Sequence, residues 1–347
     1  VIGMEDSTKT HANENIDVVR AAKLLLENDN ILILIHAKPD GDAVGSGFAL
    51  LGMLTRLGKN ARLLCSDELN VKYSLVADEN FAERTFFGKD IDDGFVPSYI
   101  VSTDLAAPGI MGAISSVYAD KINLCIDHHA VNTLEADLKL VVPSASAAGE
   151  VVLDIAREAE IISGKKIIDK PLADALFCAI MSDSGSFRYS NTTEKTFEAA
   201  AFLKHCGADT AAISEDLFES RSPENYRFCG RVIANTRLFC GGLAAVSFVT
   251  HSEIDELGIN DNDVDGAIGL VRELAGISAA VFVRETKDGK AKVSLRSKSE
   301  LNVAEICAKF GGGGHVKAAG CLIDANAEEA VKTMVEAISS AISRGEQ

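Results

Sequence analysis

Histidine and aspartate follow one short apolar run at a spacing suited to metal binding. His36, Asp40 and Asp42 come directly after the run 31–35. Carboxylate oxygens with an admixed imidazole suit Mn²⁺ and similar ions, which serve phosphoryl transfer. Because one residue separates the two aspartates, a tight turn would aim both carboxylates into one cavity, toward two different ions. The alternative is that residues 39–41 form a β-turn and that Asp42 caps the helix that follows.

Two further aspartates and a pair of histidines extend this set. Asp104 and Asp183 are carboxylates that could bridge two ions, the arrangement in which metals roughly 3.5 to 4 Å apart clamp attacking and leaving oxygens. Alone, Asp183 would be read as part of a solvated helix end. Asp127-His128-His129 is more specific, because two adjacent imidazoles at the mouth of a sheet rarely serve packing. The catalytic candidates are Asp42, His128 and His129.

The elements that must position these residues predict a doubly wound α/β sheet. Buried parallel strands are indicated by continuous apolar runs, and helices by apolar residues at helical spacing between them. The expected strands cover 31–35, 61–64, 99–101 and 123–126, and the expected helices 16–26, 43–57, 150–158 and 172–181. Ligands bind beyond the carboxyl ends of the strands in such sheets. The acidic and histidine clusters lie just there, so we expect one site.

The length of 347 residues indicates two domains. We expect a catalytic domain over 1–206, a polar linker over 207–236 and a smaller α/β domain over 237–347, with the active site in the cleft between the domains. The second domain offers strands at 243–249, 277–283, 291–295 and 318–323, and helices at 264–274, 303–309 and 327–342.

A glycine run in the second domain is a candidate for anion binding. Gly311 to Gly314 precede His315 and a predicted strand, and consecutive exposed N–H groups form an anion-binding concavity. A flexible joint is the alternative. From Arg284 to Lys317 there are eight Lys or Arg and four Asp or Glu, a local charge of +4. This domain is therefore expected to bind the substrate.

Composition narrows the class of protein. The net charge of −17 argues against coating long nucleic acid, but a small phosphorylated substrate on a local basic patch is compatible. The eight cysteines form no Cys-x-x-Cys pair, which is typical of buried thiols in a reducing compartment. No apolar run reaches the roughly 20 residues of a membrane helix. We expect a cytoplasmic protein without a membrane partner, and a homodimer is compatible with the sequence.

Taken together, these motifs resemble those of the DHH phosphoesterase superfamily. The resemblance rests on His36-x-x-Pro39-Asp40-x-Asp42, Asp104, Asp127-His128-His129 and Asp183-Ser184-Gly185. The second half is similar to the DHH-associated C-terminal domain in Leu295-Arg296-Ser297, the glycine run with His315, and Ala318-Ala319-Gly320. The two-domain form resembles the nano-RNase and pAp phosphatase group, which degrades very short oligoribonucleotides and 3′-phosphoadenosine 5′-phosphate (pAp).

The resemblance implies roles for individual positions. One divalent ion, Mn²⁺ before Mg²⁺ or Co²⁺, would bind His36, Asp40, Asp104 and Asp183. A second would bind Asp42, Asp104, His128 and Asp183, and His129 would face the scissile phosphate. The substrate-binding residues would be Arg284, Arg296, Ser297, Gly312, Gly313, Gly314 and His315. The substrate would be a short oligonucleotide or a phosphorylated nucleotide, and not a long duplex.

Several alternatives share part of this pattern. A cyclic or linear dinucleotide phosphodiesterase would share every metal ligand. A RecJ-type exonuclease needs an extended basic groove, which the net charge of −17 disfavours. The glycine run disfavours a family II inorganic pyrophosphatase, which carries another type of C-terminal domain. From a different class, a nucleotide-binding module with a vestigial centre would bind without hydrolysis.

Overall fold

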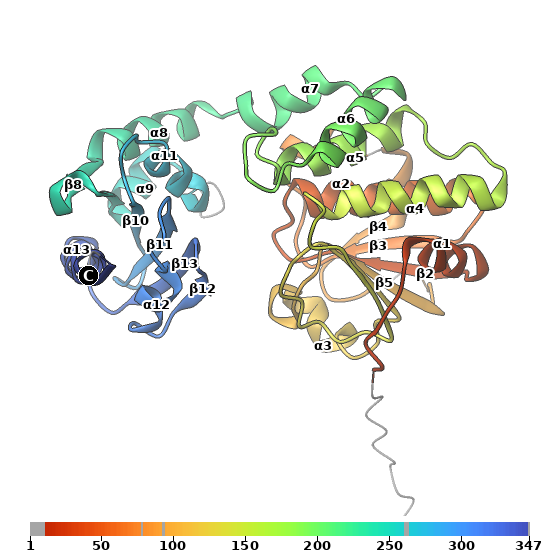
Figure 1. Cartoon of the computed structure of the whole chain (residues 1–347), viewed down its shortest axis with the longest axis horizontal. Helices are drawn as coiled ribbons and strands as arrows, with labels where there is room; N and C mark the ends of the chain where they lie inside the picture. Colours follow the sequence, from red (N-terminus) through yellow and green to blue (C-terminus); the bar gives the residue numbers. More distant parts are fainter. Residues whose placement is uncertain (1–10, 78, 92–93, 260–263, 346–347) are drawn as a thin grey trace, which may run out of the picture. The chain divides into compact units, whose positions relative to one another are not determined.

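The chain divides into two compact units, Val1–Ser220 and Arg221–Gln347 (Figure 1). This computed structural model describes residues 11–77, 79–91, 94–259 and 264–345. The boundary falls inside the segment 207–236. That segment is mainly helical: it holds α7 (Thr210–Ser214), a π-helical turn (Glu215–Glu219) and α8 (Pro223–Asn235).

The first unit is built on a parallel sheet of seven strands in the order β1-β7-β6-β5-β2-β3-β4. The central strands are continuous apolar runs because both faces of the sheet are covered. The predicted α/β class with a doubly wound parallel sheet is confirmed. The strands are β1 (Glu14–Asn15), β2 (Ile31–Leu34), β3 (Ala61–Cys65), β4 (Thr85–Phe87), β5 (Tyr99–Thr103), β6 (Leu124–Asp127) and β7 (Leu138–Val141).

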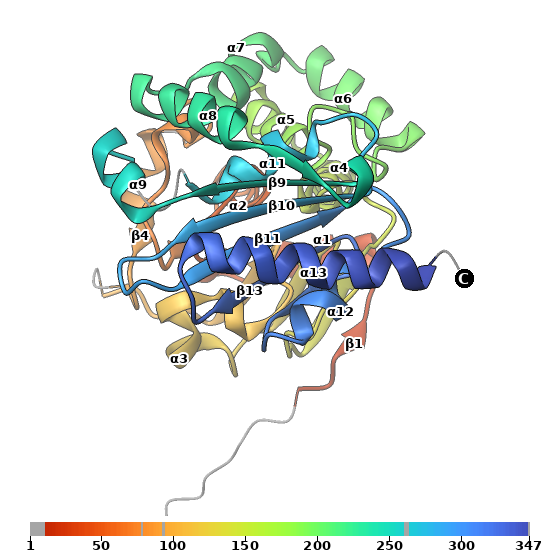
Figure 2. The same cartoon turned by 90° about the vertical axis from the view of Figure 1, so that its left-hand side faces the viewer.

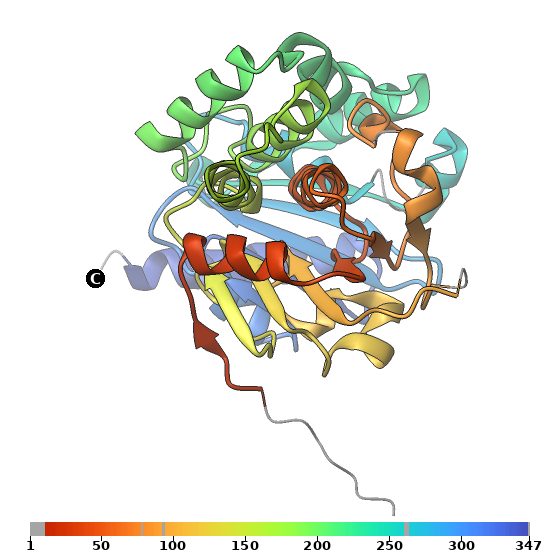
Figure 3. The ribbon, with the colours of Figure 1, turned by 90° about the vertical axis from the view of Figure 1, so that its right-hand side faces the viewer.

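The two faces of this sheet are covered unequally. Three helices, α1 (Val18–Glu27), α2 (Gly41–Arg56) and α4 (Ala148–Ser163), lie against one face (Figure 3). Behind them pack α5 (Lys170–Asp183) and α6 (Glu194–His205). The other face is covered by α3 (Ser115–Tyr118) and by short 3₁₀ turns and loops around it.

The strand order predicts where a ligand binds. From β2 the chain proceeds outward through β3 and β4 on one side, and through β5, β6 and β7 on the other. The order therefore reverses between β2 and β5. In open α/β sheets a ligand binds outside the carboxyl ends of the strands at this switch point. His36 follows β2 and Asp104 follows β5, so both flank the switch point.

The second unit is a mixed sheet of six strands in the order β12-β13-β11-β10-β9-β8. One face packs against α12 (Val303–Ala308) and α13 (Ala327–Gly345), and α13 lies across the sheet (Figure 2). On the other face α8, α9 (His251–Leu257) and α11 (Ile268–Arg272) form a core with β9 and β10. The strands are β8 (Arg237–Phe239), β9 (Ala244–Val249), β10 (Ala279–Glu285), β11 (Ala291–Ser297), β12 (Gly313–His315) and β13 (Ala318–Ile323).

That second face is covered only in part. Among the described residues, the core under α8, α9 and α11 includes Ala245, Ala280 and Phe282 from β9 and β10, but none from β11, β12 or β13. Along β11, buried residues alternate with half-buried ones, as expected for a strand with one packed face. We call the face of β11, β13 and β12 that lies opposite α12 and α13 the open half-sheet.

All eight cysteines are free thiols, and five of them are buried. Those five pack among apolar side chains, where a cysteine behaves as a small hydrophobe. In the described part of the chain, no helix combines the length and the apolar character needed to cross a bilayer.

Candidate metal centre

The loop after β2 presents two of the predicted ligands, His36 and Asp40. Asp40 is the N-cap of α2, and its Oδ1 accepts hydrogen bonds from the backbone N–H of Asp42 (3.0 Å) and Ala43 (3.1 Å). The helix is thus capped by Asp40, and the alternative in which Asp42 caps it is wrong. His36 Nε2 lies 3.7 Å from Asp40 Oδ1, and its Nδ1 lies 2.8 Å from the carbonyl oxygen of Ala37. With a proton on Nδ1, the Nε2 of His36 is the nitrogen available to a metal.

Asp42 connects the first turn of α2 to the start of another helix. Its carboxylate is fully buried and accepts hydrogen bonds from the backbone N–H of Ala148 (2.6 Å) and Gly149 (2.9 Å), the first residues of α4. The N-cap residue of α4, Ala147, has no side chain able to do this. Asp42 therefore caps α4 from outside that helix. A Cβ on Gly149 would lie 2.3 Å from the Cβ of Ala179, so only glycine lets α4 approach α5 this closely.

Asp104 lies at the centre of the cluster. It follows β5 directly, is buried, and has a left-handed backbone with φ of 52°. Its Oδ2 is 3.5 Å from His36 Nε2, and its Oδ1 is 3.7 Å from both His128 Nε2 and His129 Nδ1. Asp104 is thus the one carboxylate within 4 Å of all three of these histidines in the described part of the chain, as a bridging ligand must be.

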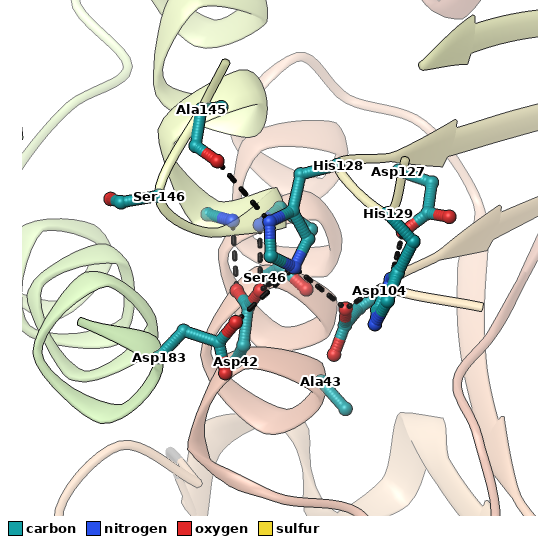
Figure 4. A network of polar contacts seen from close by, with 12 residues as sticks. Asp42, Ala43, Ser46, Asp104, Asp127, His128, His129, Ala145, Ser146 and Asp183 are labelled. Atoms are coloured by element: carbon teal, nitrogen blue, oxygen red, sulfur yellow. Dashed lines mark hydrogen bonds and ion pairs between the residues drawn. The ribbon is translucent and has the colours of Figure 1, made fainter. Parts of the chain in front are cut away.

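His128 faces three carboxylates with one ring nitrogen (Figure 4). Its Nε2 lies 3.2 Å from Asp183 Oδ2, 3.6 Å from Asp42 Oδ2 and 3.7 Å from Asp104 Oδ1. This nitrogen is buried and makes no hydrogen bond to any described residue. The other nitrogen, Nδ1, lies 3.3 Å from the carbonyl oxygen of Ala145, which keeps the proton on Nδ1. The lone pair of Nε2 is therefore directed at the space between the carboxylates.

His129 is oriented by Asp127, and Asp127 is held in turn by Asn132, a residue that the sequence did not single out. Its Nδ1 lies 2.8 Å from Asp127 Oδ1, and Asp127 Oδ2 accepts a hydrogen bond from Asn132 Nδ2 at 2.6 Å. Burial alone would raise the pKa of Asp127, but the hydrogen bonds from His129 and Asn132 lower it. Asp127 is therefore an anionic partner that fixes the ring of His129. Nothing in the spacing of Asn132 predicted this role.

Asp183 joins the cluster from the last turn of α5. The following turn is held by Ser184, whose hydroxyl donates to the Ile180 carbonyl (2.6 Å) and accepts from the Phe187 N–H (3.0 Å). Asn191 returns to this turn and donates a hydrogen bond to the carbonyl oxygen of Asp183 at 3.1 Å. The backbone around Asp183 is thus fixed on both sides.

The centre holds more acidic side chains than basic ones. Burial first, and then the charges of Asp104 and Asp183, raise the pKa of Asp42 well above its usual value. Burial raises the pKa of Asp104 to about 6. Burial alone would lower the pKa of His36, but the carboxylates of Asp104 and Asp40 raise it to about 11. Clustered carboxylates that cannot all ionise are a site that a cation would stabilise.

The predicted ligands form groups of the size that a metal ion requires. His36, Asp40 and Asp104 offer ligand atoms within 4.8 Å of one another, and so do Asp42, His128 and Asp183. Hard carboxylate oxygens with one imidazole in each group suit Mn²⁺ or Mg²⁺ better than a soft ion. Together with the orphaned Nε2 of His128, the donor set fits divalent ions. The structure thus brings all six predicted ligands to one place.

The predicted substrate-binding residues all lie in the second unit. Arg296 on β11 pairs with Ala318 on β13, and Ala318 pairs with His315 on β12, so the three positions form one row across the sheet. Ser297 is buried, and its hydroxyl donates to the Ser299 carbonyl at 2.9 Å.

The glycine run adjoins this row, whereas Arg284 lies four residues along β10 from Ala280, the residue that pairs with Arg296. Arg284 on β10 is largely buried and pairs with Lys292 of β11. Gly312 lies against Cys321, since a Cβ on it would be 2.4 Å from the Cys321 Cβ. Only a residue without a side chain fits there.

The fold and this centre define an α/β protein with a candidate site for divalent ions beyond the carboxyl ends of its parallel strands. Residues 30–180 match the family model described as DHH family, N-terminal domain, and residues 243–344 match the DHHA1 domain. The chain thus carries a DHH-family N-terminal domain followed by a DHHA1 domain, and it is a phosphoester hydrolase of this kind.

Two relatives show how far the likeness extends. The chain is 29% identical over 315 residues to the bifunctional oligoribonuclease and PAP phosphatase NrnA of Thermus thermophilus, covering 90% of each chain. It is 25% identical over 358 residues to the cyclic-di-AMP phosphodiesterase GdpP of Geobacillus thermodenitrificans, covering 96% of this chain and 51% of that protein.

Solved structures confirm the fold. An exopolyphosphatase-related protein from Bacteroides fragilis superposes with a TM-score of 0.84 at 22% identity, covering 93% of this chain and 96% of that one. RecJ from Thermus thermophilus, crystallised with Mn²⁺, has a TM-score of 0.52 at 15% identity, covering 97% of this chain and 56% of RecJ. At these identities the likeness concerns the fold alone.

Proposed function

We propose that the protein hydrolyses short oligoribonucleotides to 5′-mononucleotides and pAp to AMP. One observation carries the proposal: the match to the oligoribonuclease and PAP phosphatase of Thermus thermophilus covers 90% of both chains. The likeness to the cyclic-di-AMP phosphodiesterase is lower, at 25% identity. The match to the first relative spans both units of this chain, and the centre supplies the side chains that such hydrolysis needs.

We propose two divalent ions, with Mn²⁺ as the preferred metal. His36, Asp40, Asp104 and Asp183 would hold one ion, and Asp42, Asp104, His128 and Asp183 the other. The support is geometric, since Asp104 lies within 4 Å of histidines from both groups. Such ions would supply Lewis acidity to the phosphoryl group and lower the pKa of an attacking water.

The protein's own residues would orient the substrate and stabilise its charge. The Nδ1 of His129 is engaged by Asp127, so Nε2 on the opposite side of the ring is left for a phosphoryl oxygen. The His129 side chain is 40% exposed, unlike that of His128 at 10%, which suits a substrate contact. The pKa of His129 is raised, first by its hydrogen bond with Asp127, so a protonated ring would stabilise charge that develops on the phosphate.

We propose that the open half-sheet binds the nucleotide away from the reacting phosphate. Arg296 and Lys292 are half-buried on this face of β11, around the small residues Ala318 and Gly320 of the paired strand. A flat floor of small residues admits a nucleotide, and guanidinium and ammonium groups bind its phosphate. Gly313 and Gly314 in the neighbouring strand β12 offer exposed backbone to the same ligand. Ser297, which is buried, would support the turn that follows Arg296.

Arg296→Ala is expected to raise KM for a dinucleotide with little change in kcat. A hydrogen bond to a charged group is worth about 1.5–3 kcal/mol, so KM should rise roughly 10- to 100-fold. An interaction made equally in the ground and transition states changes KM and not kcat. Steady-state kinetics at saturating Mn²⁺ measure both constants.

Arg237→Ala is the matched control for Arg296. Arg237 is exposed on β8, at the opposite edge of the same sheet. Its loss should leave both constants unchanged. An Arg296→Ala enzyme with wild-type KM would show that the open half-sheet does not bind the substrate.

A cyclic dinucleotide phosphodiesterase is the second candidate, because 96% of this chain matches such an enzyme. Both reactions would use the same metal ligands, so only the products separate them. A hydrolysis panel with Mn²⁺ should compare dinucleotide, longer RNA, pAp and cyclic-di-AMP by chromatography of the products. Release of 5′-mononucleotide from the dinucleotide and of AMP from pAp is expected. Turnover of cyclic-di-AMP alone would favour the second candidate, and binding without turnover of any of these would indicate a nucleotide-binding module.

We also propose a cytoplasmic location and no long duplex or membrane as a partner. The eight free cysteines support a reducing compartment. The net charge of −17 opposes extended contact with polyanions. A homodimer stays compatible with both observations.

A further inference from the structure

Asn191 connects two loops that carry the centre. Its Nδ2 donates hydrogen bonds to the carbonyl oxygen of Ser146 at 2.9 Å and to the carbonyl oxygen of Asp183 at 3.1 Å. Both protons of the amide are thus used on backbone acceptors from segments far apart in the sequence. Its Oδ1 is buried and makes no hydrogen bond to any described residue. The amide therefore serves as a two-fold donor between these loops.

The loop at Ser146 is itself held in place by the carboxylate of Glu150. The carboxylate oxygen Glu150 Oε2 accepts hydrogen bonds from the Ser146 N–H (3.2 Å), the Ser146 hydroxyl (2.9 Å) and the Thr196 hydroxyl (3.2 Å). All three residues are buried. Buried charge-assisted bonds of this kind hold geometry because the unpaired groups would be costly. The backbone at Ser146 is therefore held in place, and the hydrogen bonds of Asn191 link the backbone of Asp183 to it.

Both tied segments act directly on His128. The residue before Ser146, Ala145, offers the carbonyl that holds His128 Nδ1 at 3.3 Å. Asp183 presents the carboxylate nearest to His128 Nε2, at 3.2 Å. Asn191 thus joins the support of one candidate ligand to the backbone of another. A small change in the length or polarity of the Asn191 side chain would alter the distance between His128 Nε2 and the Asp183 carboxylate.

We propose that Asn191 is a positioning residue that sets the affinity of the centre for divalent metal. This inference rests on the proposed metal centre and adds a residue that contacts neither ion nor substrate. Groups that orient metal ligands change metal affinity or activity by about 10- to 100-fold when removed. The bridge needs two donors at one position, which an amide supplies and a carboxylate does not.

Asn191→Asp tests this role with almost no change in volume. The substitution places a carboxylate oxygen against two carbonyl oxygens, so the bridge is lost. Calorimetric titration of the metal-free full chain with Mn²⁺ should show Kd raised about 10- to 100-fold. At saturating Mn²⁺, kcat and the KM for dinucleotide should return close to wild-type values, because the ligands and the substrate contacts are intact.

Two further variants separate metal affinity from folding. Asn191→Ala removes the bridge without adding charge and should weaken Mn²⁺ binding in the same direction. Asn235→Asp is the matched control, because Asn235 Nδ2 likewise donates to a backbone carbonyl, that of Phe248 at 3.0 Å, in the second unit. It should bind Mn²⁺ as the wild type does. Circular dichroism of each metal-free variant reports whether it is folded.

The outcomes distinguish this inference from the proposal on which it rests. If the wild type binds no Mn²⁺, the metal centre itself is wrong. If the wild type binds Mn²⁺ and folded Asn191 variants bind it equally well, the metal centre stands and the role of Asn191 is wrong. If both Asn191 variants are unfolded without metal while Asn235→Asp is folded, Asn191 maintains the fold and the inference is overturned.

Discussion

Asp104→Asn is expected to abolish hydrolysis while it raises the melting temperature of the metal-free protein. Asp104 is the carboxylate that lies within 4 Å of His36, His128 and His129, so its loss would weaken the binding of both proposed ions. Activity should fall well beyond the ~100-fold that follows removal of a group that merely orients a metal ligand. Asparagine adopts left-handed backbone more readily than most residues, so the φ of 52° at this position is tolerated.

The expected rise in melting temperature follows from the pKa of the Asp104 carboxyl group. Burial raises the pKa of Asp104 to about 6, above the roughly 3.9 of an unfolded aspartate. A carboxyl whose folded pKa exceeds its unfolded pKa costs stability once the pH is above the folded value, and costs none below the unfolded value. The gain in melting temperature should therefore be larger at pH 8 than at pH 5. Thermal unfolding in chelator at both pH values measures it.

Asp174→Asn is a control in which the melting temperature should change in the opposite direction. Asp174 is also buried, but its Oδ1 accepts from the Asp209 N–H at 2.7 Å and its Oδ2 lies 2.6 Å from Lys170 Nζ. Its replacement should lower the melting temperature and leave kcat unchanged. A metal-free Asp104→Asn protein that melts below the wild type would contradict the view that the centre stores repulsion between carboxylates.

Removal of metal should have the second large effect. Chelation is expected to abolish hydrolysis, and Mn²⁺ is expected to restore it. A ligand at about 100 times its Kd stabilises the folded state by about 2.7 kcal/mol per site. For a unit of this size the melting temperature should rise by roughly 5 to 10 °C for each ion bound. Differential scanning calorimetry with and without Mn²⁺ tests this rise.

The calorimetric signal has its own control. Asp104→Asn should show little or no rise on addition of Mn²⁺, since the central carboxylate is absent. Ca²⁺ and Mg²⁺ in parallel titrations would rank the metals by the same measure. Full hydrolysis by the wild type in excess chelator would refute a metal-dependent reaction.

The clustering of the candidate ligands was predictable because their positions follow from strand ends. Apolar runs mark β2, β5 and β6, and in a parallel sheet the carboxyl ends of neighbouring strands meet at one edge. His36, Asp104 and His128 each lie within two residues of such an end. The types of these residues and their positions at strand ends were therefore enough to predict that they lie together.

Some elements of the fold could not be predicted for a physical reason. β1, β4 and β8 have two or three residues each, too few to show a periodic pattern. They form because a neighbouring strand offers unpaired backbone groups. The segment 207–236 was expected to be a polar linker, and α8 forms there as a polar helix with only Phe228 and Val232 buried, so no apolar period marked it in the sequence.

The supporting residues were not predictable from sequence either. Asn132, Glu150 and Asn191 act through hydrogen bonds, to a carboxylate, a hydroxyl or backbone carbonyls. Such partners are separated by up to 46 residues along the chain, as Glu150 and Thr196 are. Residue type alone does not distinguish these side chains from ordinary turn residues. Only the folded backbone shows which carbonyl each one reaches.

The capping of α4 by Asp42 has an evolutionary consequence. His36 and His128 are candidate ligands that cap no helix, whereas Asp42, also a candidate ligand, satisfies the N–H groups of Ala148 and Gly149. Loss of such a cap costs about 1 kcal/mol of stability. In a descendant that no longer hydrolyses anything, selection would release the histidines first and keep this aspartate. Retention of Asp42 alone would then record ancestry, and the histidines would be the better markers of an active enzyme.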